Sequence, residues 1–202
     1  MVDQPRSLRA GATSPVQSST KSSTPIIYRV KPLTQYQSWI YLAHRAQFSK
    51  PGAYQSFDVA GFPLFLIRGK DSQIRAFHNV CRHRAYTITR KETGASTVLG
   101  CKYHGWSYDT YGRLVKAPQF DDVPGFDKSE NSLFEIHAQT TDHGWIFVNL
   151  NASEPAALSA SSVSELKAFA GSAGVGPTST WITGRTLTGA FNWKLGSKHA
   201  LL

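Results

Sequence analysis

Two short segments of the sequence each carry a pair of metal-binding side chains. The first is Cys81-Arg82-His83, and the second, after seventeen intervening residues, is Cys101-Lys102-Tyr103-His104. Each segment offers one thiolate and one imidazole from a tight loop. Paired ligands of a single zinc usually stand about two to five residues apart, so a C-x-H pair is too tight for one metal. The pairs suit two adjacent loops that clamp a dinuclear cluster, with both thiolates on one iron and both imidazoles on the other.

The histidines would set the charge of such a cluster. Two ferric ions, two sulfides, two thiolates and two neutral imidazoles carry no net charge, and one electron makes the cluster singly negative. A cluster with four cysteines is already doubly negative before it is reduced. Neutral imidazole ligands therefore make reduction easier and raise the potential. Imidazoles at the surface would also give the electron an exit.

Short apolar runs surround both segments and predict strands. A hairpin loop is expected at Gly69-Lys70-Asp71-Ser72. A short helix is expected over 33–46, ended by Pro51 and Gly52, and a helical stretch over 163–169. Closely spaced strands with glycine-rich turns indicate an all-β domain of antiparallel strands. The strands are expected over 56–60, 64–68, 73–78, 97–99, 114–116, 134–139 and 145–150.

The ligand segments resemble the Rieske 2Fe-2S domain of ring-hydroxylating and choline-monooxygenase-type oxygenase α-subunits. This resemblance implies the Rieske fold, with antiparallel strands and a small cluster-binding subdomain. It also implies one 2Fe-2S cluster per chain, bound by Cys81, His83, Cys101 and His104. The matching residues are Cys81–Arg84, Cys101–Trp106, Tyr108, Asp109, Gly112 and Leu114, with 39–44, 51–52, 61–68, 144–148 and 192–195 around them.

The cysteine count favours the oxygenase type of Rieske domain. Rieske proteins of respiratory and photosynthetic complexes carry two more cysteines in a disulfide, and this chain has none beyond the two ligands. Trp106 stands where those proteins place a hydroxyl that donates to the cluster, so we expect a lower potential. In the resembling oxygenases this tryptophan shields the cluster, and a plain core aromatic is the alternative. Ala85 and Lys102, where the family often has Gly and Pro, bear on loop shape rather than on cluster identity.

The resemblance implies an electron relay. Such a module accepts single electrons from a reductase or ferredoxin and passes them to a mononuclear non-haem iron, held by two histidines and a carboxylate in a second domain. That triad usually follows an Asn-Trp-Lys segment, but Asn192-Trp193-Lys194 is followed only by 195–202, where His199 alone does not supply it. We therefore expect neither a mononuclear iron site nor catalytic residues in these 202 residues. The rival interpretations are a stand-alone Rieske ferredoxin and a zinc-bound interaction module.

Composition divides the chain into four parts. Residues 1–26, rich in Ser, Thr, Pro and Gln, are expected to be a disordered tail, and 36–150 form the Rieske domain. Residues 151–180 are interpreted as a linker and 181–202 as the truncated start of a catalytic domain. A full-length form of the protein, if one exists, could assemble as a homo-oligomer.

The N-terminal residues bear on the location of the protein. Arg6, Arg9 and many hydroxyl residues would suit a mitochondrial presequence, but Asp3 and the lack of an amphipathic stripe argue against one. No secretory signal and no membrane span of about eighteen apolar residues is present, so we expect a cytoplasmic protein.

The formal charge of +9 is concentrated in one segment. Residues 68–102 hold eight basic and two acidic side chains, a net +6, while residues 1–30 carry the remaining +3. The segment can dock an acidic redox partner or can simply be solvated. Nucleic acid is not expected, because no binding motif accompanies the charge. The eight basic residues are Arg68, Lys70, Arg75, Arg82, Arg84, Arg90, Lys91 and Lys102; the other histidines, His44, His78, His137, His143 and His199, are interpreted as structural or surface residues.

Overall fold

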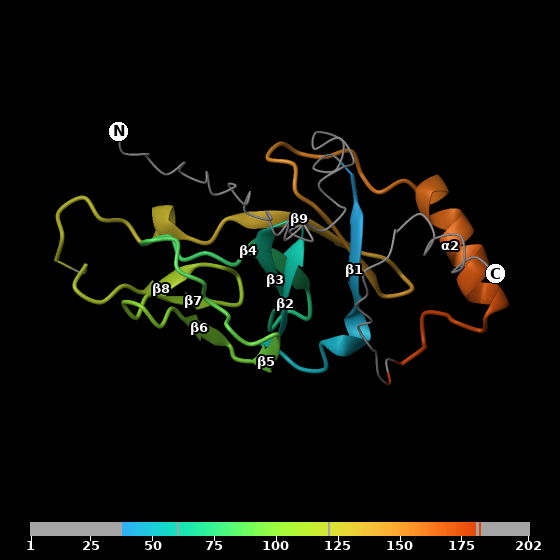
Figure 1. The fold of residues 1–202 in the computed structure, drawn as a ribbon, viewed down its shortest axis with the longest axis horizontal. Helices are drawn as coiled ribbons and strands as arrows, with labels where there is room; N and C mark the ends of the chain where they lie inside the picture. The colour runs from blue at the N-terminus through green and yellow to red at the C-terminus, as the bar shows by residue number, and fades with distance from the viewer. Residues whose placement is uncertain (1–37, 60, 121, 181, 183–202) are drawn as a thin grey trace, which may run out of the picture. The chain divides into compact units, whose positions relative to one another are not determined.

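Antiparallel strands make up most of the regular structure in the computed structural model, which describes residues 38–59, 61–120, 122–180 and 182. A seven-stranded sheet has the order β1-β10-β9-β4-β3-β2-β5, and a three-stranded sheet has the order β6-β7-β8 (Figure 1). The predicted all-β class is confirmed. The elements are β1 Ile40–His44, η2 Arg45–Gln47, β2 Ala53–Val59, β3 Phe62–Arg68, β4 Ile74–His78, β5 Thr93–Ala95, β6 Val98–Gly100, β7 Ser107–Asp109, β8 Leu114–Lys116, η3 Ser129–Asn131, β9 Glu135–Thr140, β10 Trp145–Asn149 and α2 Ala160–Ser172.

All seven strands expected from the sequence are present, with ends shifted by at most three residues. The hairpin loop at 69–72 is confirmed as well, because β3 and β4 pair directly across it. Two further strands, β5 and β7, carry no sequence signal. Each has only three residues, and each is defined by its neighbours: β5 pairs with β2, and β7 lies between β6 and β8.

The helix expected over 33–46 is wrong for its described part. Residues 40–44 form β1, which pairs with β10 from Ile40 opposite Val148 to His44 opposite Trp145. A short apolar run satisfies a helical and an extended pattern equally well, and the free edge of β10 selects the strand. Only residues 45–47 turn helical, as a single 3-10 turn capped by His44.

Strand β3, which lies between β4 and β2 in the sheet, is buried on both faces, so its apolar run is continuous rather than alternating. Phe65 and Ile67 pack into a core that also contains both motif cysteines. Leu64 and Leu66 pack into a second core with residues of β1, β4, β9 and β10. One face of the sheet therefore packs beneath the cysteines, and the other face packs against the second core.

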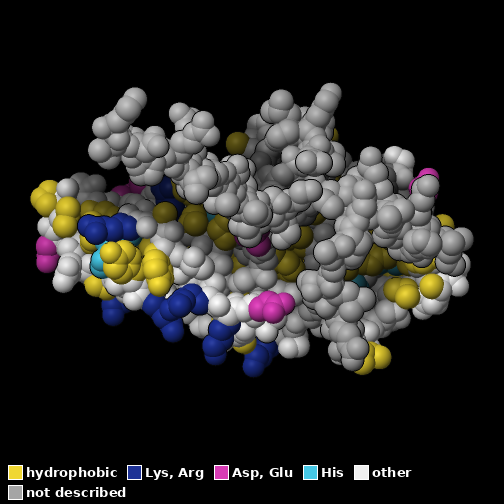
Figure 2. Space-filling view, in the orientation of Figure 1, with side chains coloured by type: hydrophobic (Ala, Val, Ile, Leu, Met, Phe, Trp, Pro, Cys, Tyr) yellow, Lys and Arg dark blue, Asp and Glu magenta, His cyan; other side chains and the backbone are white. Residues whose placement is uncertain are grey.

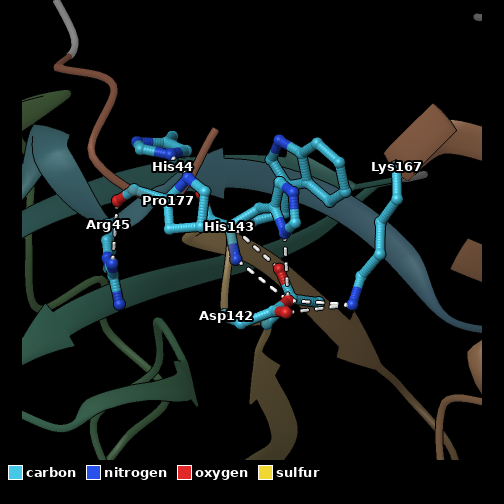
Figure 3. A network of polar contacts seen from close by, with 8 residues as sticks. His44, Arg45, Asp142, His143, Lys167 and Pro177 are labelled. Carbon is cyan, nitrogen blue, oxygen red and sulfur yellow. Dashed lines mark hydrogen bonds and ion pairs between the residues drawn. The ribbon is translucent and has the colours of Figure 1, made fainter. Parts of the chain in front are cut away.

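Helix α2 lies against β10 through Val163, which joins a small core with Trp145. The predicted helical stretch at 163–169 is thus confirmed and extended, within the segment interpreted as a linker. An ion pair of 3.0 Å joins Lys167 to Asp142 in the β9–β10 turn (Figure 3). Hydrogen bonds from His143 and Lys167 hold the pKa of Asp142 well below its usual range.

The tail predicted over 1–26 and all but one residue of the segment 181–202 lie outside the described residues. His199 and Asn192-Trp193-Lys194 belong to that segment. Among the helices that the structure describes, none is both long enough and apolar enough to span a membrane.

Candidate metal centre

The two ligand segments fold into the same backbone turn. We call Cys81–Tyr86 the first loop and Cys101–Trp106 the second loop. In each, the cysteine N–H donates to the carbonyl five residues on, at 2.8 and 2.7 Å. The N–H four residues on donates back to the cysteine carbonyl, at 2.8 and 3.0 Å. That fourth residue is left-handed in both loops, with φ of 52° at Ala85 and 76° at Gly105.

Different elements hold the two loops in place. The first loop follows β4 and is closed by the buried Asn79, whose Nδ2 donates to the carbonyl of Thr89 at 3.0 Å. Its Oδ1 accepts the N–H groups of Ile88 and Thr89 at 3.2 and 2.9 Å. The second loop instead joins β6 to β7, with Leu99 opposite Tyr108. We call these hydrogen bonds of Asn79 the clamp of the first loop. The second loop is closed instead by the backbone pairing of β6 with β7.

The loops bring both thiols together inside the domain. Cys81 and Cys101 are each 3% exposed and lie in the core beneath the loops. Both are free thiols, and they belong to the same core cluster. Burial raises the pKa of Cys101. A cation beside the pair is what would favour the thiolate form, as metal ligation requires.

The hydroxyl of Tyr108 reaches the same pair of thiols. Its Oη lies 3.2 Å from Cys81 Sγ and accepts the N–H of Arg82 at 3.1 Å. Burial raises the pKa of Tyr108, so the hydroxyl keeps its proton. Because Oη already accepts from the backbone, that proton is available for Sγ. The expectation of a lower potential rested on the hydroxyl missing at Trp106. Tyr108 supplies another hydroxyl, which the sequence does not reveal because it lies 27 residues from the cysteine that it contacts.

The two histidines lie side by side but in different surroundings. Their ring centroids are 4.6 Å apart. His83 is half-buried, with Trp106 stacked on it at 4.9 Å and 10°. Phe120 meets its edge at 5.4 Å, and burial lowers the pKa of this histidine. His104 is exposed and contacts the ring of Tyr103, which is itself largely exposed, at 3.8 Å.

This donor set fits a cluster of two irons. His83 Nδ1 is buried and has no hydrogen-bond partner among the described residues, as an iron ligand would explain. Two soft sulfurs lie on one side and two imidazoles on the other, which matches one iron for each pair. In the part of the chain that the structure describes, no three His, Cys, Asp or Glu side chains converge on one point suited to a single metal ion. A cluster that shares its four ligands between two irons needs no such point.

The family model for the Rieske [2Fe-2S] domain matches residues 38–127. Both loops lie within that match. Residues 38–127 are a Rieske domain. The match begins just before β1 and ends after the aromatic cover of His83, so it contains every part of the centre described above.

Named relatives of this Rieske domain are oxygenase subunits. The α-subunit of chlorobenzene dioxygenase from Cupriavidus sp. is 38% identical over 120 residues, which cover 59% of this chain and 26% of that protein. The oxygenase subunit of carnitine monooxygenase from Acinetobacter baumannii is 36% identical over 115 residues, covering 57% and 31%. The chain thus spans about a quarter to a third of the length of these curated relatives.

Solved structures of oxygenases share the fold. A quaternary ammonium Rieske monooxygenase in complex with an inhibitor superposes with a TM-score of 0.61 at 30% identity, covering 75% of this chain and 41% of that one. Naphthalene 1,2-dioxygenase with indole bound gives 0.56 at 30% identity, covering 60% and 28%. These matches favour the oxygenase interpretation over the stand-alone ferredoxin and the zinc module.

The other described histidines lie apart from the two loops. His44 Nε2 is 2.7 Å from the carbonyl of His143, and His143 contacts Asp142. His137 lies 3.8 Å from Glu154, and burial lowers the pKa of His78. Their interpretation as structural or surface residues agrees with these contacts. Sequence reasoning missed Asn79, which only its contacts with residues nine and ten positions further on identify.

Proposed function

We propose that this Rieske domain relays single electrons from a reductase or ferredoxin to the mononuclear non-haem iron of an oxygenase. The observation that carries the proposal is the arrangement of the four side chains. The two sulfur atoms lie inside the domain, and the two imidazoles lie toward its surface. A group bound between the loops then has one protected end and one end within reach of a partner. The likeness to oxygenase subunits supports the same direction of electron flow.

In this proposal Cys81 and Cys101 hold one iron, and His83 and His104 hold the other. The bound 2Fe-2S cluster, one per chain, supplies one-electron redox chemistry. The chain's own residues set its surroundings. Tyr108 donates to the sulfur of Cys81, and the ring of Trp106 keeps water from His83. The exposed ring of His104 provides the exit.

The proposed domain arrangement follows the sequence boundaries. Residues 36–150 are the electron-transfer domain, 151–180 connect it onward, and 181–202 begin a catalytic domain. The relatives' greater length supports a longer protein, in which the acceptor iron belongs to that second domain. We place the protein in the cytoplasm, as expected from its sequence.

The structure sharpens the proposed docking of an acidic partner. Three of the eight basic residues are used internally: Arg75 pairs with Asp71 at 2.6 Å, Arg68 holds the hairpin, and Arg82 lies 3.8 Å over the ring of Phe134. The other five are exposed, and the described residues give them no ion pair. In Figure 2 the Lys and Arg side chains gather on the left half, which holds β6, β7 and β8 in Figure 1. The exposed five are Lys70, Arg84, Arg90, Lys91 and Lys102.

Ligand substitution tests the centre. Reconstituted protein should hold about two irons per chain and give a rhombic EPR signal when reduced, at an average g below that of a four-cysteine cluster. Cys81→Ser and Cys101→Ser should each abolish the cluster. A Ser107→Ala control, outside both ligand pairs, should retain it. One stoichiometric zinc without iron would overturn the proposal.

Charge reversal tests the docking face. Arg84→Glu with Lys102→Glu should slow reduction by the partner and flatten its dependence on ionic strength. Each of the two single reversals has Lys50→Glu as its matched control, because that substitution makes the same change of charge outside the basic segment. Equal rates and equal salt dependence in both proteins would show that the charges only solvate the surface.

The relay role has a further test. The 202-residue chain should accept electrons under anaerobic conditions and yield no oxygenated product when oxygen and aromatic or quaternary-ammonium compounds are added. Mass spectrometry measures the product. Stoichiometric hydroxylation by this chain alone would contradict the proposed placement of the acceptor iron in a further domain.

A further inference from the structure

A hollow of about 400 Å³ lies beside η2 and the β3–β4 turn, apart from the two loops. Two arginines, Arg45 and Arg68, line it. Three serine residues from separate segments, Ser49, Ser72 and Ser179, also line it. None of the described residues that line it is acidic. Among these residues the hollow therefore combines two cations with hydroxyl groups and has no carboxylate to neutralise them.

Both guanidinium groups are held in place with donors to spare. Arg68 donates from Nη1 to the carbonyl of Phe48 at 2.9 Å and from Nη2 to Ser72 Oγ at 3.0 Å. Arg45 donates from Nη2 to the carbonyl of Pro177 at 3.1 Å (Figure 3). Each guanidinium has five N–H groups, so the hydrogen bonds to described residues leave three on Arg68 and four on Arg45. Neither forms an ion pair within the described part of the chain.

The nearest acidic groups are neutralised elsewhere. Asp71 precedes Ser72 but is bound by both terminal nitrogens of Arg75, at 3.1 and 2.6 Å. Asp142 lines an adjoining hollow with Arg45 and is paired with Lys167. The remaining local charge in the first hollow is positive, and an anion would complete it.

We propose that this hollow binds a phosphate-type oxyanion. The donors come from several directions, and a tetrahedral anion can offer acceptors to two guanidiniums and to hydroxyls at once. A carboxylate has only two oxygens, both in one plane, so it can reach fewer of these donors at once than a tetrahedral anion can. His44 also lines the hollow, but its Nδ1 accepts from Ala46 and its Nε2 lies against the carbonyl of His143, so its ring is already occupied.

The bound oxyanion would also link two parts of the chain. Arg45 and Arg68 belong to the sheet domain, whereas Ser179 and the carbonyl that Arg45 reaches belong to the segment after α2. Binding therefore holds that segment against the domain. This role is independent of the cluster and of the electron relay.

Calorimetric titration of the iron-loaded protein tests the site, with inorganic phosphate, sulfate and acetate at constant ionic strength. Phosphate and sulfate should bind saturably with one site per chain, and acetate should bind at least tenfold more weakly or show no saturable binding. Arg45→Gln should weaken phosphate binding by about tenfold or more, because a charge-assisted hydrogen bond is lost. Lys50→Gln removes the same charge nearby without touching the lining and should leave the affinity unchanged.

Arg68→Gln should weaken binding as well, but it also removes the contacts to Phe48 and Ser72. Arg68→Lys keeps the positive charge but replaces the planar guanidinium by an ammonium group, so it too should weaken binding if the planar group is required. Equal weakening by Lys50→Gln and Arg45→Gln would overturn the proposal in favour of general electrostatics. Acetate that binds saturably but at least tenfold more weakly than phosphate agrees with the proposal, whereas acetate that binds within tenfold of phosphate, or no saturable phosphate binding at all, would overturn it.

Discussion

The two loops have one backbone turn in common and differ in almost everything around it. The first loop is closed by the side chain of Asn79 and presents a half-buried histidine. The second loop is closed by a strand ladder and presents an exposed one. Within the same turn, the histidine stands two positions after the cysteine in one loop and three in the other. That single-residue offset, together with the aromatic neighbours, decides which imidazole is covered and which is available to a partner.

Removal of the aromatic ring that packs on each histidine should show the largest difference between the two loops, measured as the loss in the free energy of unfolding. Trp106 is 2% exposed and packs on His83, so Trp106→Ala should lower the free energy of unfolding by about 4 kcal/mol, as for other buried aromatics. Tyr103 is 54% exposed over His104, and Tyr103→Ala should cost under ~1 kcal/mol. Denaturant titration of the loaded protein measures both. Equal losses would contradict the asymmetry between the two histidines.

The clamp of the first loop should come next. Asn79→Ala removes three hydrogen bonds and strands buried backbone groups, at a cost of about 3 kcal/mol in the free energy of unfolding. Iron should also be lost faster, because the loop is no longer closed. Asn131→Ala, which removes one exposed hydrogen bond at η3, is the control and should change the stability by under ~0.5 kcal/mol. If the Asn79→Ala protein kept its iron and its stability, the backbone hydrogen bonds of the turn would be sufficient to close the loop.

The residue with positive φ is alanine in one turn and glycine in the other, so each can be replaced by the residue of the other turn. Gly105→Ala forces a side chain into a left-handed conformation, 3.3 Å from Pro118, and should destabilise by about 1–2 kcal/mol. Ala85→Gly relieves the same strain but raises the chain entropy of the unfolded state, so we expect a gain in stability under ~1 kcal/mol. Thermal unfolding of the pair measures the difference. Destabilisation by Ala85→Gly would mean that the methyl group makes a contact worth more than the strain.

The smallest effect should be on the potential. Tyr108→Phe removes a donor to Cys81 Sγ that disperses negative charge. One hydrogen bond of about 1 kcal/mol corresponds to roughly 40 mV for a one-electron couple, so the potential should fall by that order. Tyr111→Phe is the control, because that ring lies under Arg75, away from the thiols. Protein-film voltammetry measures both, and equal potentials would contradict the proposed donation.

Spacing along the chain was enough to predict the chemistry of the centre. Cys81, His83, Cys101 and His104 are recognisable because ligand type and local separation are properties of the sequence itself. The all-β class follows in the same way, since hairpin turns and apolar runs are local signals. The left-handed fourth position of each turn was marked by Gly105 but hidden by Ala85, where the turn imposes φ on a residue that disfavours it.

Partners chosen across the fold could not be derived from the sequence. Residues 40–44 are a strand because the edge of β10 is open to them, not because their own pattern excludes a helix. Arg75 and Arg82 left the predicted docking face because Asp71 and Phe134 were close enough in space to engage them. The sequence therefore predicts the four ligands, while the covering of His83 and the exposure of His104 are decided by tertiary packing. The physical reason is that packing energies depend on which surfaces meet, and that is settled only when the sheets have formed.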